Sequence, residues 1–254
     1  MPQPKFDTSM LDELVAAFAA KDLVGLARME RMARGISAAE PLDGYMLLGA
    51  CAAAKGDAEA ATLNHEASIH VSPMRLDAWC NYLVSLMILG DSARVRDLAF
   101  KIGARFPANP HAHAAAMNAL IELGLLQSAT RFAAKFCSER VDNDEANCVD
   151  AVLSARGFTE DDLSAAVVCA RRFLADNGVV RPRFSCEYIE DDEGGPGELA
   201  YGFHVKADAT AAHLLERALF EHLANARVAA EDAGAVTFFI EVLPEERTHA
   251  DSPR

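Results

Sequence analysis

The side chains that could do chemistry are a few histidines and carboxylates near the C-terminal end of the chain. His204 and Glu187 fall in two segments whose residues alternate between apolar and polar, and both lie on the polar side. A histidine beside a carboxylate is the pairing that general acid–base catalysis uses, provided that both groups line a pocket. His213 and His222 follow in a helical segment, nine residues apart and so on opposite sides of a helix. No pocket is predicted for them, so we expect surface side chains and assign no catalytic residue.

His111 and His113 look like a metal-binding pair. They begin a helical segment after Pro110, where residues two apart point to different faces. Zinc needs three or four convergent ligands, and no third is near in the sequence. The acidic run at 190–193 lacks the spaced oxygen ligands of a calcium loop, and GGPG at 194–197 is read as a turn. The chain also has no P-loop, dinucleotide or G-x-S-x-G motif. We therefore expect no metal and no cofactor.

Composition and charge argue against several other classes of protein. The 254 residues are 51% hydrophobic but only 7% aromatic, which favours closely packed helices over a large β-sandwich. The net charge of −14 argues against a nucleic-acid partner. There is no apolar run of about 18 residues, and the N-terminus lacks the pattern of a signal peptide. We expect a cytoplasmic protein that does not bind a membrane.

The six cysteines fit the same expectation. None belongs to a C-x-x-C pair, and none has a histidine or lysine arrangement nearby that would activate a thiolate. Most fall inside helical patterns, as small buried side chains do. They are Cys51, Cys80, Cys137, Cys148, Cys169 and Cys186.

Helical segments separated by regularly spaced glycines must position these side chains. The glycines, at intervals of 34, 34 and 33 residues, are Gly56, Gly90, Gly124 and Gly157. Pro41, Pro73 and Pro107 keep a similar spacing, each a few residues after a helical pattern. A constant period of this length is typical of a helical array. The array predicts an α-solenoid of helical hairpins.

Three units align directly, and they resemble tetratricopeptide repeats, in which 34 residues form two antiparallel helices. The units are 42–75, 76–109 and 110–143. A degenerate first unit runs from Ser9 to Pro41, and a fourth at about 143–175 needs a one-residue slip. The resemblance covers about residues 9–175.

The resemblance implies a concave groove that binds a protein or peptide and is lined by the first helix of each unit. In this sequence the groove positions are Met46, Ala50, Ala53, Cys80, Asn81, Val84, Met87, His111, Ala114, Asn118 and Ile121. One subfamily clamps a C-terminal carboxylate with lysine, arginine and asparagine at such positions. Asn81 and Asn118 are compatible with a clamp, but no lysine or arginine accompanies them. The set favours an apolar or amphipathic segment. Alternatively, these residues pack between repeats or under the C-terminal part.

The pattern changes after Gly178, which predicts a repeat domain at 1–178 and a small domain at 179–254. Residues 183–254 hold 15 acidic and 6 basic side chains, a balance of −9. Alternation predicts strands near 183–190, 199–207 and 235–243, with a helix near 209–226 and a flexible tail. A three-stranded β-β-α-β unit is small for independent stability. We expect it to dock on the last helical hairpin or to form a homodimer.

The fold class is thus mainly α, a solenoid followed by a small α+β domain. The leading hypothesis is an adaptor or scaffold that is not an enzyme. The alternatives are a catalytic or ligand-sensing C-terminal domain whose substrate the repeats recruit, or a secretion-type chaperone. Fold class does not choose among them.

Overall fold

A computed structural model describes residues 9–137, 149, 151–179, 182–190, 195, 197–226 and 236–242. Residues 191–193 of the predicted acidic run, the tail from residue 243 and part of the fourth unit's first half lie outside the described residues.

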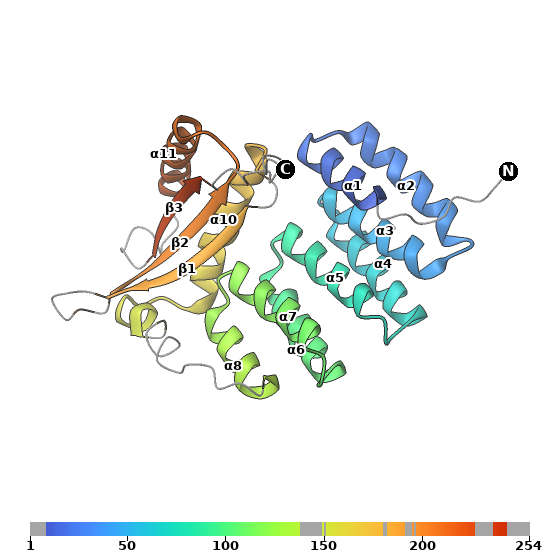
Figure 1. The fold of residues 1–254 in the computed structure, drawn as a ribbon, viewed down its shortest axis with the longest axis horizontal. Helices are drawn as coiled ribbons and strands as arrows, with labels where there is room; N and C mark the ends of the chain where they lie inside the picture. Colours follow the sequence, from blue (N-terminus) through green and yellow to red (C-terminus); the bar gives the residue numbers. More distant parts are fainter. Residues whose placement is uncertain are drawn as a thin grey trace, which may run out of the picture.

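Four helical hairpins follow one another along the chain, as Figure 1 shows. They are α1 (Ser9–Ala19) with α2 (Leu23–Ser37), α3 (Pro41–Ala54) with α4 (Ala58–Val71), α5 (Leu76–Leu89) with α6 (Ser92–Arg105), and α7 (Pro110–Glu122) with α8 (Leu126–Phe136). The first helices α3, α5 and α7 pack against one another and form an inner layer, with α1 against α3. Apolar side chains fill the interior of the hairpins, including Met29, Leu47, Leu86 and Leu120. The predicted hairpin array is confirmed.

Glycine is required at the turns because the backbone there is left-handed. Gly90, after α5, has φ of +68°, and the equivalent Gly124 has φ of +71°. The amide of Asp91 donates to Leu86 O at 3.0 Å and that of Leu125 donates to Leu120 O at 2.8 Å, which closes each helix in the same way. The 34-residue period thus repeats one backbone turn.

In the first three hairpins an aspartate starts the second helix, beginning with Asp22 at α2. Asp57 accepts a hydrogen bond from the amide of Ala60 at 3.0 Å, and Asp91 accepts one from that of Arg94 at 3.1 Å. In the α7–α8 turn the corresponding residue is Leu125, which has no side-chain cap. The N-terminus of α8 therefore needs an acceptor from elsewhere.

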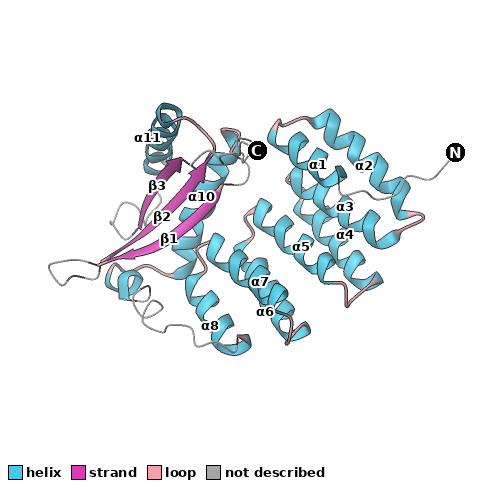
Figure 2. Cartoon of the chain, viewed as in Figure 1, coloured by secondary structure: helices cyan, strands magenta, loops and turns pink. Residues whose placement is uncertain are grey.

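The remaining elements are α10 (Glu160–Asp176), β1 (Arg183–Ile189), β2 (Glu198–Val205), α11 (Ala209–Asn225) and β3 (Val236–Val242). The sheet order is β1-β2-β3, with β1 antiparallel and β3 parallel to the central strand β2. Figure 2 shows this sheet at one end of the molecule, beside α10 and α11. The predicted β-β-α-β order is confirmed, and the mainly α class with it.

One side of the sheet shares a hydrophobic core with α10 and α11. Leu199, Tyr201 and Phe203 of β2 are at most 1% exposed. They belong to one buried cluster with Val167 of α10 and Leu219 of α11. The predicted boundary at 178/179 therefore runs between two segments that are packed together, and the small unit docks on α10.

Candidate functional site

The inner layer of the hairpins encloses a hollow of about 690 Å³. Side chains from α1, α3, α5 and α7 line its walls, together with Arg171 of α10. Most of the lining is apolar, with the amides of Asn81 and Asn118 between. Val84 lies in this lining with 40% of its surface exposed.

The structure brings together part of the predicted groove. Six of the predicted residues line the hollow: Ala50, Cys80, Asn81, Val84, Met87 and Asn118. Met46 and Ala53 do not, because they are only 6% and 2% exposed. The Met46 sulfur accepts a hydrogen bond from Asn81 Nδ2 at 3.5 Å.

The other predicted positions lie on α7. His111 and Ala114 are exposed but outside the hollow, and Ile121 is half-buried against the core. The lining of α7 comes instead from Ala115, Asn118, Ala119 and Glu122. In this unit Ala115 and Glu122 therefore line the hollow in place of Ala114 and Ile121, whereas Asn118 lines it as predicted.

The sequence reasoning missed the contributions of α1 and α10 to the lining. Leu14, Val15 and Phe18 of α1 line the hollow, and so do Arg171 of α10 and Pro182. The repeat period predicts the first helices of aligned units, but the α1 unit is degenerate and α10 belongs to none of the three aligned units. An amphipathic reading of α1 would have found Leu14 and Phe18.

Arg171 supplies a positive charge that the repeat helices do not. Its Nη1 lies 3.0 Å from Glu122 Oε2 and donates to the Glu122 carbonyl oxygen at 3.3 Å. The Arg171 and Glu122 side chains are 19% and 27% exposed. Glu122 neutralises Arg171, a lining cation that the sequence argument about a clamp did not include.

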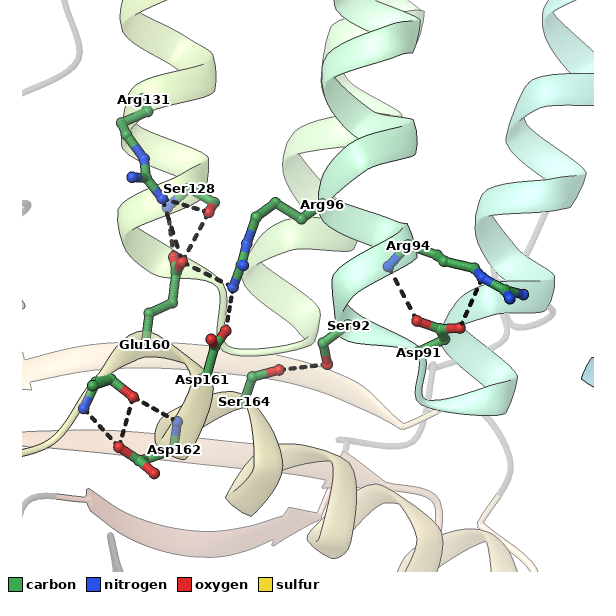
Figure 3. Close-up of polar contacts among 11 residues, drawn as sticks. Asp91, Ser92, Arg94, Arg96, Ser128, Arg131, Glu160, Asp161, Asp162 and Ser164 are labelled. Carbon is green, nitrogen blue, oxygen red and sulfur yellow. Dashed lines mark hydrogen bonds and ion pairs between the residues drawn. The ribbon is translucent and has the colours of Figure 1, made fainter.

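Glu160, in the first turn of α10, supplies the acceptor that α8 lacks. The carboxylate is 7% exposed and accepts hydrogen bonds from the Ser128 amide at 2.5 Å and the Ser128 hydroxyl at 2.8 Å. The Ser128 amide is the position of α8 that Asp91 would cap in α6. Arg96 of α6 approaches the same carboxylate at 3.2 Å and Arg131 at 3.5 Å, as Figure 3 shows. A buried carboxylate is thus satisfied by two hydrogen bonds and two guanidinium groups.

Further contacts hold α10 across the turns of the hairpins. Ser164 hydrogen-bonds Ser92 at 2.6 Å, and Arg172 donates to the carbonyl oxygen of Leu89 at 3.1 Å. At the far end of α10, Asp176 lies 3.0 Å from Lys21, in the turn between α1 and α2. The first hairpin and α10, which both contribute to the lining of the hollow, are therefore joined by an ion pair.

A second cleft, of about 960 Å³, lies on the other side of α10. There Cys169 Sγ lies 3.6 Å from Nε2 of His222, a residue of α11 that is 53 positions away in the sequence. The expectation that no histidine lies near a cysteine is wrong for this pair, because α10 and α11 bring the two residues together. Elsewhere, burial raises the pKa of the Cys51 thiol to about 11, which disfavours its thiolate.

The side of the sheet away from the shared core carries His204. Its Nδ1 lies 3.0 Å from Glu241 Oε2 on β3, and its Nε2 lies 3.1 Å from Ser185 Oγ on β1. The predicted pairing of His204 with Glu187 is therefore replaced by two other contacts. The register explains this, since Glu187 pairs with Ala200 and lies four residues further along β1 than Arg183, the residue opposite His204.

Comparisons with protein-family models, with curated proteins and with solved structures each returned no match. Within the described part of the chain, no helix is long and apolar enough to cross a membrane. Among the same residues, no three histidine, cysteine, aspartate or glutamate side chains gather as metal ligands would.

Proposed function

We propose that the protein is an adaptor whose tetratricopeptide-like hairpins bind the apolar face of an amphipathic helix of a partner protein. The observation that carries this proposal is the hollow in the inner layer, with Val84 exposed among apolar side chains. A surface of this kind gains free energy when an apolar group covers it.

The chemistry of the lining supports this kind of partner. Asn81 and Asn118 offer amide donors and acceptors among apolar neighbours, and the ion pair between Arg171 and Glu122 is internally neutral. The lining therefore favours a segment that brings apolar side chains and no strong charge. A hollow of about 690 Å³ has room for the side chains on one face of a helix.

The experiment begins by placing a photo-crosslinking amino acid at position 84 in cells and identifying the attached partner segment. The affinity of that segment, made as a peptide, is then measured for the original chain and for Val84→Glu. We expect Val84→Glu to weaken binding by about 100-fold, because the new carboxylate would be buried without a partner.

Leu63→Glu is the matched control, because Leu63 on α4 is 69% exposed and lies outside the hollow. It adds the same charge to another exposed apolar residue, and we expect its affinity to stay within twofold. Circular dichroism checks that both variants keep their helices. Equal affinity of Val84→Glu and Leu63→Glu would place the binding site elsewhere.

A further inference from the structure

Three residues from three strands form one row of polar contacts on the open face of the sheet. Ser185 of β1 contacts His204 Nε2 at 3.1 Å, and Glu241 of β3 contacts His204 Nδ1 at 3.0 Å. The central strand thus carries the imidazole, and each neighbouring strand supplies one of its two partners.

The two contacts favour one tautomer of the neutral imidazole. A carboxylate oxygen 3.0 Å from Nδ1 attracts a proton there, which leaves the lone pair on Nε2. In that tautomer the Ser185 hydroxyl donates to Nε2. This is the arrangement in which a histidine can remove the proton of a serine that attacks a carbonyl group.

Gly202 makes room for the row. A β-carbon at this position would lie 2.6 Å from Ser185 Oγ and 2.4 Å from Cζ of Phe239. Glycine at this position therefore lets the Ser185 side chain reach His204. The ring of Phe239 lies over the same glycine, next to the serine. The row also remains open to solvent, with 21% of the His204 side chain and 60% of the Glu241 side chain exposed.

We propose that Ser185 is a nucleophile that accepts small acyl groups from activated esters, with His204 as its general base and Glu241 as the residue that orients His204. This inference rests on the sheet alone and is independent of the adaptor function. Because the row lies on an open face, the fitting substrates are small esters with good leaving groups, and turnover is expected to be slow.

The reaction has two steps. Ser185 Oγ attacks the carbonyl carbon while its proton passes to His204 Nε2; the ester C–O bond then breaks, and the leaving alcohol takes that proton. In the second step water attacks the acyl-serine ester and gives a proton to His204, which returns it to Ser185 Oγ as the acid is released.

The test uses the full chain with p-nitrophenyl acetate and, separately, a fluorophosphonate probe. We expect a burst of p-nitrophenol, and mass spectrometry should place both the acetyl group and the phosphonyl group on Ser185. Ser185→Ala should reduce the burst at least tenfold, and His204→Gln should do the same with Ser185 still present.

Thr237→Ala is the matched control. Thr237 carries a hydroxyl group on the same face of the sheet. This hydroxyl donates to Glu198 Oε2 at 3.2 Å and not to an imidazole. Its removal should change the burst less than twofold. Circular dichroism verifies the fold of each variant. The proposal is overturned if the original chain shows no burst, if Ser185→Ala or His204→Gln keeps it, or if the adducts map to other residues.

Discussion

The described part of the chain contains two serine–histidine hydrogen bonds in contrasting surroundings. In the repeats, His65 Nε2 of α4 lies 2.7 Å from Ser85 Oγ of α5, and the imidazole is fully buried. In the sheet, His204 and Ser185 are 3.1 Å apart on an open face. The second nitrogen makes the difference, because Nδ1 of His65 has no hydrogen-bond partner among the described residues, whereas Nδ1 of His204 faces Glu241.

Their surroundings assign the two pairs to different roles. The His65 ring stacks on Tyr82 with centroids 5.3 Å apart, and burial lowers its pKa from 6.5 to about 4. A neutral, packed imidazole of this kind joins two helices and has no group to stabilise a positive charge. A serine–histidine bond therefore indicates chemistry only where a third group can orient and support the imidazole and a substrate can reach the serine.

The largest predicted effect is the loss of stability in acid that His65 causes. Below pH 6.5 the unfolded chain binds a proton on this histidine, while the folded chain does not until about pH 4. The unfolded state is therefore favoured as the pH falls, and His65 alone should cost about 3 kcal/mol of stability between pH 7 and pH 4. Urea unfolding at pH 7 and at pH 4 measures this loss of stability.

The comparison variant is His65→Leu with Ser85→Ala, which replaces both partners by apolar groups. Carboxylates such as Glu30, whose pKa is lowered by its hydrogen bonds to Lys55 and Arg34, also lose stability in acid in both proteins. Their contribution cancels in the difference, so the double variant should lose about 3 kcal/mol less than the original chain. An equal loss would mean that His65 is protonated in the folded state.

Glycine-to-alanine changes at the two pairs should differ in kind. A β-carbon on Gly49 would lie 2.6 Å from the buried His65 ring, which cannot move away, so Gly49→Ala should destabilise the protein by about 2 kcal/mol. On the open face, Ser185 and Phe239 can rotate away from a β-carbon on Gly202. Gly202→Ala should therefore cost about 1 kcal/mol or less but abolish the burst with p-nitrophenyl acetate.

Urea unfolding and burst kinetics on both variants separate the two effects. The contrast fails if Gly49→Ala keeps full stability or if Gly202→Ala keeps its burst.

Local patterns predicted the elements themselves. The recurring glycines anticipated left-handed turns at positions such as Gly90 and Gly124, because only that residue adopts them readily. Alternation in 183–190 and 199–207 anticipated β1 and β2, since one side of the sheet is buried.

Contacts between elements that are distant in the sequence could not be predicted from sequence patterns. The cap that Glu160 provides for α8 joins residues 32 apart, and the approach of Cys169 to His222 joins residues 53 apart. No period or propensity encodes either contact, because α10 crosses the turns of the hairpins instead of repeating their stacking. The hollow is another example. Residues of α3, α5 and α7 in its lining could be predicted from the repeat, whereas Arg171 comes from α10, outside the aligned units.

The row on the sheet shows how register decides a site. The sequence placed His204 and Glu187 on the polar side of the sheet. Only the pairing of β1 with β2 and the parallel placement of β3 select which polar residues meet: Glu241 lies directly opposite His204, and Ser185 lies diagonally across.

The smallest stability effect in this comparison should come from Glu241→Gln. The carboxylate is 60% exposed, and exposed pairs contribute little, so we expect a change in unfolding free energy below about 0.5 kcal/mol. The amide of glutamine can donate to Nδ1 as well as accept from it, so it no longer imposes the tautomer that leaves Nε2 free to accept the serine proton. The burst should therefore slow by about tenfold. Glu187→Gln, which changes a carboxylate on the same face without a contact to His204, is the control, and a burst equally fast in both variants would show that Glu241 does not orient the imidazole.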